Sequence, residues 1–292
     1  MRRLAIVNPR SGTLSDSMLP RLLEQLREVA SDVVFTEHAG HARRIVSGAA
    51  AHEGVLVVGG DGTVLEAING LDLGRQCLGI VPTGRGNSLA RDAAVHPEAF
   101  ALGHIRQGRR ARIDLIDLRF EDQSGTHHQC LAASTDAVGY PARVVTVASA
   151  RFRGLGSLAY GAAAACIRPV TIRVRRQLDD EVPTEGTLTG LIINNTRHLA
   201  NFVGLPAASC RDGRLDVMEM RVGAIRQCLH NLSALSNLQC YTPAAVRTAS
   251  AVRLDFERPQ ELLVDGELFA NVVHVHAAVK ASALDLVHGW TS

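Results

Sequence analysis

The stretch that most constrains the fold of this chain is an apolar run followed at once by three closely spaced glycines. The run is Val55–Val58, and Gly59, Gly60 and Gly62 come directly after it. Four apolar residues, three of them β-branched, are typical of a strand that is buried in a parallel sheet. Glycine tolerates positive φ and lets another group approach the main chain closely, so we expect a tight turn at the end of this strand.

A helix is predicted directly after this turn. Thr63 can cap the helix, and Glu66, three residues later, can complete a capping box. A strand, a glycine turn and a helix N-terminus direct main-chain N–H groups toward a common point, which is a geometry that binds anions and phosphate above all. Asp61 lies inside the turn, where a carboxylate beside phosphates requires a metal ion or a proton. The alternative is a glycine-rich connection without a ligand, which the entropic cost of three glycines disfavours.

Short apolar strands alternate with helical patterns over the first third of the chain. The expected strands are 3–8, 32–36, 55–58 and 76–81, and the expected helices are 18–30, 41–51, 64–69 and 88–94. This alternation predicts a doubly wound parallel sheet, and ligands bind such sheets outside the carboxyl ends of the strands. Three polar, glycine-bearing turns lie at that edge, at 8–12, 59–63 and 82–88. Together they favour a nucleotide site.

The pattern changes from Arg112 onward, where strands follow one another and helical signal is sparse. Strands are expected at 112–120, 171–175, 188–194, 215–221, 251–256, 261–264 and 272–277, and helices at 140–150, 156–166 and 223–238. A run of strands after an α/β half predicts a second, mainly antiparallel domain. We therefore expect a nucleotide-binding α/β domain over 1–115 and a β-sandwich over 116–292, with the last residues as candidates to pack back on the first domain.

Composition excludes several classes of function. The net charge of +2 and an aromatic content of 4% give no support to nucleic-acid binding. Lys280 is the only lysine, so a Walker-type phosphate loop, which needs a lysine in its glycine turn, is excluded. The six cysteines form no Cys-x-x-Cys pair, which indicates buried thiols and argues against a zinc site. Neither a signal peptide nor a transmembrane span is visible, so we expect a cytoplasmic protein.

Several motifs occur in an order that is similar to one family. They are Asn8-Pro-Arg-Ser-Gly12, Gly59-Gly-Asp-Gly-Thr63 with Asn69-Gly70, Pro82-Thr-Gly-Arg-Gly-Asn87, and the late Asp265-Gly-Glu267. The chain resembles the diacylglycerol kinase catalytic-domain family, which also holds sphingosine kinases, ceramide kinases and bacterial lipid kinases. NAD kinases and phosphofructokinases carry turns similar to residues 59–63, so the specificity of the resemblance comes from the whole set.

The resemblance implies that ATP, Mg²⁺ and a lipid at a membrane surface are the partners. It implies Glu267 as the general base for the attacking hydroxyl. Asp61, by its position in the glycine turn, is expected to hold Mg²⁺ directly or through water, since hard cations prefer carboxylate and water oxygens. It implies a Mg²⁺ site made by Asp212 and the main-chain oxygens of Ser209 and Arg214. Together, the resemblance and the three turns give a nucleotide set of Asn8, Thr36, Gly59, Gly60, Asp61, Gly62, Thr63, Glu66, Thr83, Gly84, Arg85, Gly86 and Asn87.

Two positions depart from the bacterial pattern of the family. Leu65 stands before Glu66 where Asn is frequent, and Ser88 stands after Asn87 where Asp is frequent. Three functions therefore stay open. The first is a lipid kinase acting on a diacylglycerol- or sphingosine-type hydroxyl, the second is a kinase of a non-lipid alcohol such as NAD, and the third is a nucleotide-binding regulator without catalysis. A homodimer is left open as well. For Asp265–Glu267, an ordinary Asp-Gly hairpin is the structural alternative to a catalytic role.

A basic stretch suggests contact with a membrane. No acidic residue occurs between Asp136 and Asp179, and apolar residues are interspersed among arginines there. Such a surface can rest on an anionic leaflet, as peripheral enzymes do at the inner membrane face, although a solvated face is an equal alternative. The arginines are Arg143, Arg151, Arg153, Arg168, Arg173, Arg175 and Arg176.

Overall fold

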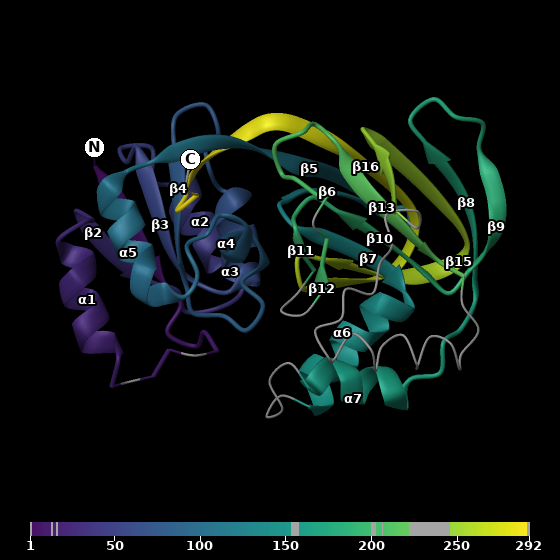
Figure 1. Cartoon of the computed structure of the whole chain (residues 1–292), viewed down its shortest axis with the longest axis horizontal. Helices are drawn as coiled ribbons and strands as arrows, with labels where there is room; N and C mark the ends of the chain where they lie inside the picture. The colour runs from purple at the N-terminus through teal and green to yellow at the C-terminus, as the bar shows by residue number, and fades with distance from the viewer. Residues whose placement is uncertain are drawn as a thin grey trace. The chain divides into compact units, whose positions relative to one another are not determined.

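The computed structural model describes residues 2–12, 14–15, 17–152, 158–199, 203–205, 207–221 and 246–290. The chain divides into two compact units (Figure 1). Unit 1 comprises residues 1–114 and 281–292, and unit 2 comprises residues 115–280. The chain passes between them within β5 (Arg110–Asp122) and again within β16 (Glu267–Val287).

Unit 1 is built on a parallel sheet. Its strands are β1 (Arg3–Val7), β2 (Asp32–Phe35), β3 (Gly54–Gly59) and β4 (Cys77–Pro82), in the order β4-β3-β1-β2. The end of β16 adds a further parallel strand beside β4, where Asp285 pairs with Cys77. Every residue of β3 and β4 is buried, as expected for central strands that are covered on both faces.

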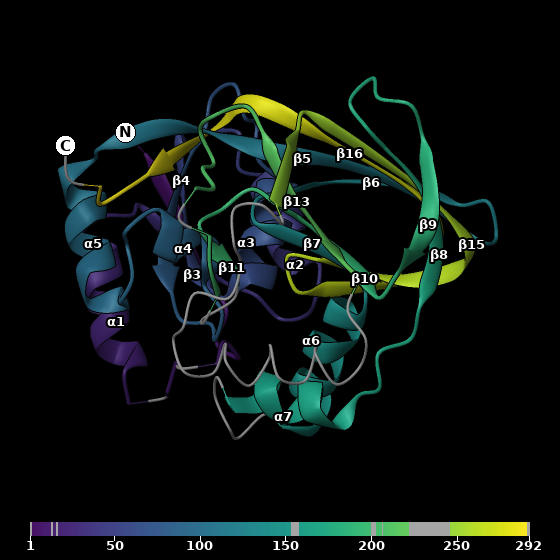
Figure 2. The ribbon, with the colours of Figure 1, turned by 45° about the vertical axis from the view of Figure 1, so that its right-hand side comes forward.

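Helices connect and cover these strands. They are α1 (Leu19–Arg27), α2 (His41–Ser47), α3 (Asp61–Ile68), α4 (Ser88–Asp92) and α5 (Glu98–Gln107). Figures 1 and 2 show α1 and α5 on one face of the sheet and α2 and α3 on the other. The predicted doubly wound arrangement is therefore confirmed. Sequence reasoning missed α5 and placed the start of α3 three residues too late.

Unit 2 is mainly antiparallel. Its strands are the rest of β5 and β16, β6 (His127–Ala132), β7 (Thr135–Gly139), β8 (Ile172–Leu178), β9 (Thr184–Leu188), β10 (Gly190–Asn194), β11 (His198–Leu199), β12 (Val203–Gly204), β13 (Leu215–Met220), β14 (Val246–Ala249) and β15 (Ala251–Val264). Its helices are α6 (Tyr140–Arg151) and α7 (Leu158–Cys166), which pack against each other. The predicted helix at 223–238 lies outside the described residues, as do Cys228 and Cys240. None of the four described cysteines is in a disulfide.

The long strand β15 organises unit 2. Its first half pairs with β8, and its second half pairs with β7, while β16 runs antiparallel along both halves. Irregular register between Asp255 and Leu262 separates the halves, as a β-bulge does when it bends a strand. The two strands predicted at 251–256 and 261–264 are thus one strand. Beyond β7 the sheet continues through β10, β13 and β14.

One carboxyl group in unit 2 is buried without a hydrogen bond to any described residue. Asp136, on β7, is 1% exposed, and neither of its carboxyl oxygens has a hydrogen-bond partner among the described residues. Burial, with a further contribution from the charge of Asp265, raises the pKa of Asp136 well above its ordinary value of 3.8. In the unfolded chain Asp136 ionises near its ordinary pKa of 3.8, whereas in the folded chain it stays protonated. The free energy of unfolding therefore falls as the pH rises above 3.8.

We therefore expect the substitution Asp136→Asn to remove a pH-dependent loss of stability. The free energy of unfolding of the variant should rise relative to that of the parent chain by at least about 1 kcal/mol between pH 5 and pH 7.5. Urea unfolding at both pH values measures this, with Asp180→Asn at an exposed turn as the control. If the free energies of unfolding of Asp136→Asn and of the parent chain changed equally with pH, this would contradict the raised pKa of Asp136.

Candidate functional site

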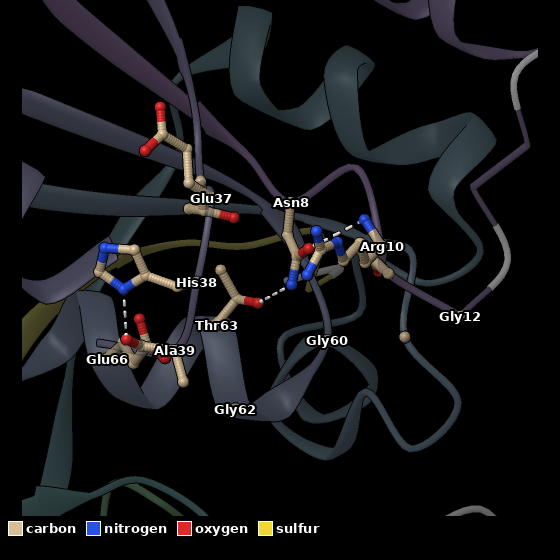
Figure 3. A pocket seen from close by; sticks show the side chains of 13 residues that line it. Asn8, Arg10, Gly12, Glu37, His38, Ala39, Gly60, Gly62, Thr63 and Glu66 are labelled. Atoms are coloured by element: carbon tan, nitrogen blue, oxygen red, sulfur yellow. Dashed lines mark hydrogen bonds between the residues drawn. The ribbon is translucent and has the colours of Figure 1, made fainter. Parts of the chain in front are cut away.

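A cavity of about 380 Å³ opens in unit 1 beside the carboxyl ends of the parallel strands (Figure 3). Asn8 follows β1, Thr36 follows β2, Gly60 follows β3 and Gly84 lies just beyond β4, so each of these strands contributes to the lining. This is the edge at which doubly wound sheets bind their ligands. The lining residues are Asn8, Arg10, Ser11, Gly12, Thr36, Glu37, His38, Ala39, Gly60, Gly62, Thr63, Glu66 and Gly84.

The N-terminus of α3 faces this cavity without a side-chain cap. The helix begins at Asp61, and its N-cap residue is Gly60, in an extended conformation. The main-chain N–H of Val64 donates to the carbonyl oxygen of Gly60 at 3.1 Å, so the amides of Gly62 and Thr63 precede the first intrahelical donor. Both residues line the cavity. Uncapped amides at a helix N-terminus attract an anion.

The predicted capping box of Thr63 and Glu66 is wrong, because α3 starts two residues earlier than Thr63. Oγ1 of Thr63 instead accepts a hydrogen bond from Nδ2 of Asn8 at 2.9 Å, which ties the turn after β1 to the helix. The carboxylate of Glu66 caps a different helix. It accepts hydrogen bonds from the main-chain amides of Gly40 at 2.8 Å and Ala42 at 3.0 Å, at the start of α2.

Two glycine-bearing loops pack directly on each other at the base of the cavity. A Cβ atom on Gly84 would lie 2.3 Å from Cα of Gly60, a distance that real Cβ atoms do not adopt. Asn87, at φ 53°, folds its side chain back on this loop. Its Oδ1 accepts from the amide of Gly84 at 3.0 Å, and its Nδ2 donates to the carbonyl oxygen of the same residue at 2.7 Å. The glycines here are needed for contact between loops as well as for access of a ligand.

Asp61 joins the two loops. Its carboxylate accepts hydrogen bonds from the main-chain amides of Asn87 at 2.7 Å and Ser88 at 2.8 Å, at the beginning of α4. Burial raises the pKa of Asp61, and the hydrogen bonds from Ser88 and Asn87 oppose that rise. A Cβ atom on Gly86 would lie 2.4 Å from Oδ2 of Asp61, so this contact also depends on a glycine. A role of Asp61 beside a metal ion stays a prediction.

The predicted nucleotide residues fall into two groups. Those that line the cavity are Asn8, Thr36, Gly60, Gly62, Thr63, Glu66 and Gly84; those outside its lining are Gly59, Asp61, Thr83, Arg85, Gly86 and Asn87. Arg10, Ser11 and Gly12, which also line the cavity, belong to the predicted turn at 8–12, whereas sequence reasoning missed Glu37, His38 and Ala39. The segment 37–39 directly follows the end of β2, so the same rule of carboxyl strand ends identifies it.

In unit 2, Asp265 and Gly266 form a two-residue hairpin between β15 and β16. Both have positive φ, at 44° and 94°, and Val264 pairs with Glu267 across the turn. The Asp-Gly turn is therefore a hairpin, which does not decide between a purely structural and a catalytic function, and the role of Glu267 as a base stays a prediction. Glu267 is exposed.

The carboxylate of Asp265 fixes this hairpin to the chain at the start of β7. It accepts hydrogen bonds from the main-chain amides of Ala133, Ser134 and Thr135 at 2.7 to 2.9 Å. Asp265 also donates its own amide to the carbonyl oxygen of Thr135 at 3.0 Å. The neighbouring Glu267 thus projects from a turn that is held at its first residue.

The predicted metal ligands lie in the turn before β13. Oδ1 of Asp212 accepts from the amide of Arg214 at 2.9 Å, and Oγ of Ser209 accepts from the amide of Arg211 at 3.3 Å. Burial and the nearby charge of Asp212 raise the pKa of Asp216 to about 6. Among the described residues, no cluster of three or more His, Cys, Asp or Glu side chains could hold a metal ion. Main-chain oxygens would have to complete any such site.

The basic stretch is only partly a surface. Arg176 is 7% exposed and forms an ion pair with Glu219, so this residue belongs to the interior of unit 2. Arg173 is exposed and pairs with Glu257 at 3.1 Å. Arg143, Arg151, Arg168 and Arg175 are exposed, and Arg153 lies outside the described residues. Within the described part of the chain, no helix has the length and apolar character needed to cross a membrane.

The protein therefore combines an α/β unit, whose glycine-rich turns border the cavity, with a mainly antiparallel β unit. Residues 2–118 match the family model of the diacylglycerol kinase catalytic domain. This match covers less than half of the chain, and it confirms the resemblance to the diacylglycerol kinase catalytic-domain family that the motifs indicate.

Known relatives agree with this resemblance. Sphingosine kinase 2 of Homo sapiens is 29% identical over 181 residues, which cover 53% of this chain and 27% of that protein. Sphingoid long-chain bases kinase 1 of Arabidopsis thaliana is 38% identical over 103 residues, covering 30% of this chain and 13% of that protein. The chain thus spans about a quarter or less of these relatives.

A solved structure confirms the predicted fold class. The crystal structure of a diacylglycerol kinase from Bacillus anthracis str. Sterne matches this chain with a TM-score of 0.76. The match covers 99% of this chain and 97% of that chain at 19% sequence identity. The similarity therefore extends over both units, although at this identity it shows the fold alone.

The contact between the two glycine loops gives a stability test. Gly84→Ala should lower the free energy of unfolding by about 1–3 kcal/mol, because the added methyl group overlaps the main chain at Gly60. Gly62→Ala is the matched control, since a Cβ atom there meets no atom within 4 Å. Urea unfolding followed by circular dichroism measures both variants. Equal stability of the two would show that the loops do not depend on this contact.

Proposed function

We propose that this protein is an ATP-dependent lipid kinase, which transfers the γ-phosphate of ATP to the hydroxyl group of a diacylglycerol- or sphingosine-type lipid. The observation that carries the proposal is the uncapped N-terminus of α3, which opens on a polar cavity within the residues that match the diacylglycerol kinase catalytic domain. Phosphoryl transfer depends mainly on positioning and on neutralising charge, and main-chain amides supply both without a lysine.

In this proposal the phosphates of ATP lie against the amides of Gly62 and Thr63. Arg10, which also lines the cavity, can donate to phosphate oxygens from the turn after β1. Arg85 is exposed, and its side chain lies beside Gly12, where a Cβ atom would be 3.2 Å from Cγ of Arg85. These two arginines are therefore the candidates for offsetting the negative charge that develops during transfer.

Glu267 is proposed as the base that accepts the proton of the lipid hydroxyl. The three amide contacts of Asp265 limit the motion of the hairpin that bears Glu267. A base of this kind must come within hydrogen-bond reach of the hydroxyl. The motif match, rather than the geometry, carries this assignment.

The residues around Asp212 have the donor chemistry that Mg²⁺ requires. Hard cations prefer carboxylate, carbonyl and water oxygens. Asp212 supplies a carboxylate, and its charge contributes to the raised pKa of Asp216. Asp212, with the main-chain oxygens of Ser209 and Arg214, would hold the ion. When bound, Mg²⁺ would supply positive charge that offsets the negative charge of the phosphates.

The proposal is tested with radiolabelled ATP and a panel of lipids presented in mixed micelles and in anionic vesicles. Glu267→Gln should reduce phosphate transfer by a factor of roughly 10² to 10⁴, the usual contribution of general base catalysis, while ATP binding persists. Binding measured by calorimetry separates the two effects. Glu257→Gln, an exposed carboxylate of β15, is the matched control.

Undiminished turnover in Glu267→Gln would contradict the role of this residue. Binding of ATP by the parent chain without transfer to any lipid would contradict the kinase assignment and would favour a nucleotide-binding regulator. Transfer to a water-soluble alcohol in the absence of any micelle or vesicle would contradict the lipid acceptor.

A further inference from the structure

The cavity in unit 1 has two chemically different ends. Figure 3 shows Arg10 and Gly12 on one side, His38 and Glu66 on the other, and Thr63 between them. The first side offers arginine and glycine main chain, which suits phosphates. The second side offers an imidazole ring and a carboxylate that is already used to cap α2. A triphosphate accounts for the first side and leaves the second unexplained.

The ring of His38 is held in one orientation. Its Nε2 lies 2.8 Å from Nη2 of Arg44, and its Nδ1 lies 2.7 Å from the carbonyl oxygen of Ala39. A guanidinium group can only donate, so Nε2 accepts and Nδ1 carries the hydrogen that it donates to Ala39. The ring is therefore fixed by a hydrogen bond at each of its two nitrogen atoms.

A second imidazole supports this ring from behind. His38 and His41 stack with ring centroids 4.9 Å apart and an interplanar angle of 10°. His41 is itself held, because its Nδ1 accepts a hydrogen bond from the amide of Glu37 at 3.1 Å. Among the described residues no other ring stacks on His38, and its side chain is exposed in the lining of the cavity. One face of a rigid aromatic ring is thus left for a ligand.

We propose that the purine ring of the nucleotide stacks on His38, which makes this residue a determinant of nucleotide affinity. This inference rests on the proposed function, in that the cavity must take ATP. Every nucleobase has a flat π face, and stacking on an aromatic side chain adds affinity without reading hydrogen-bond donors. A platform that is already immobilised by His41, Arg44 and Ala39 loses little conformational entropy when the base binds.

The test compares ATP with inorganic tripolyphosphate, which has the phosphates but no base. In the parent chain and in His38→Ala, the dissociation constant of each is measured by isothermal titration calorimetry. We expect His38→Ala to weaken ATP binding by at least about fivefold, as loss of one base stack does, and to leave tripolyphosphate binding unchanged. His38→Phe, which keeps the aromatic face, should recover most of the affinity for ATP. His127→Ala, an exposed histidine of β6, is the control.

The outcomes separate the inference from the proposal on which it rests. Unchanged ATP affinity in His38→Ala would overturn the stacking role while leaving the kinase proposal intact. An equal loss for ATP and tripolyphosphate would also overturn it, because His38 would then act by shaping the cavity. Failure of the parent chain to bind either compound would overturn the nucleotide site itself and the inference with it.

Discussion

The site in unit 1 depends on the contact between two loops that only glycine permits. Gly60 and Gly84 bring the turn after β3 and the loop after β4 so close that a single methyl group on Gly84 would fall within 2.3 Å of the opposite main chain. This contact fixes the start of α3 relative to the neighbouring strand. The amides of Gly62 and Thr63 then remain uncapped beside the cavity, and all of the proposed nucleotide chemistry follows from that position.

A second theme is the use of carboxylates as acceptors for main-chain amides. Asp61 accepts from the start of α4, Glu66 from the start of α2, and Asp265 from three successive amides at the start of β7. Each of these acids stands in a motif, and each has a structural function in the fold. A carboxylate near a helix N-terminus satisfies donors that would otherwise lack a partner, which is why acids accumulate in such motifs. Position in a motif therefore does not separate an acid that touches a ligand from one that organises the loops around it.

Sequence reasoning predicted what periodicity and glycine spacing determine. The four strands of the parallel sheet, the change to antiparallel strands near residue 112 and the carboxyl-edge location of the cavity all follow from local patterns. Pairing between distant strands could not be predicted, because no local sequence pattern shows that 251–264 is one bent strand or that β16 runs from Glu267 to Val287. The capping box failed because Glu66 finds its donors 24 and 26 residues away, in α2. The burial of Arg176 was equally hidden, since this residue occurs in an alternating segment where either face can be the interior. The burial of Asp136 was missed because no strand was predicted at 135–139.

The most direct test of the account is the response of the amides at the start of α3 to nucleotide. In the ¹⁵N-labelled chain, the account predicts that ATP shifts the amide resonances of Gly62 and Thr63 and slows their hydrogen exchange, because their N–H groups gain phosphate acceptors. Inorganic tripolyphosphate should reproduce both effects, while adenosine should not. If saturating ATP shifts other resonances but leaves those of Gly62 and Thr63 unchanged, the nucleotide binds elsewhere and the central claim is contradicted.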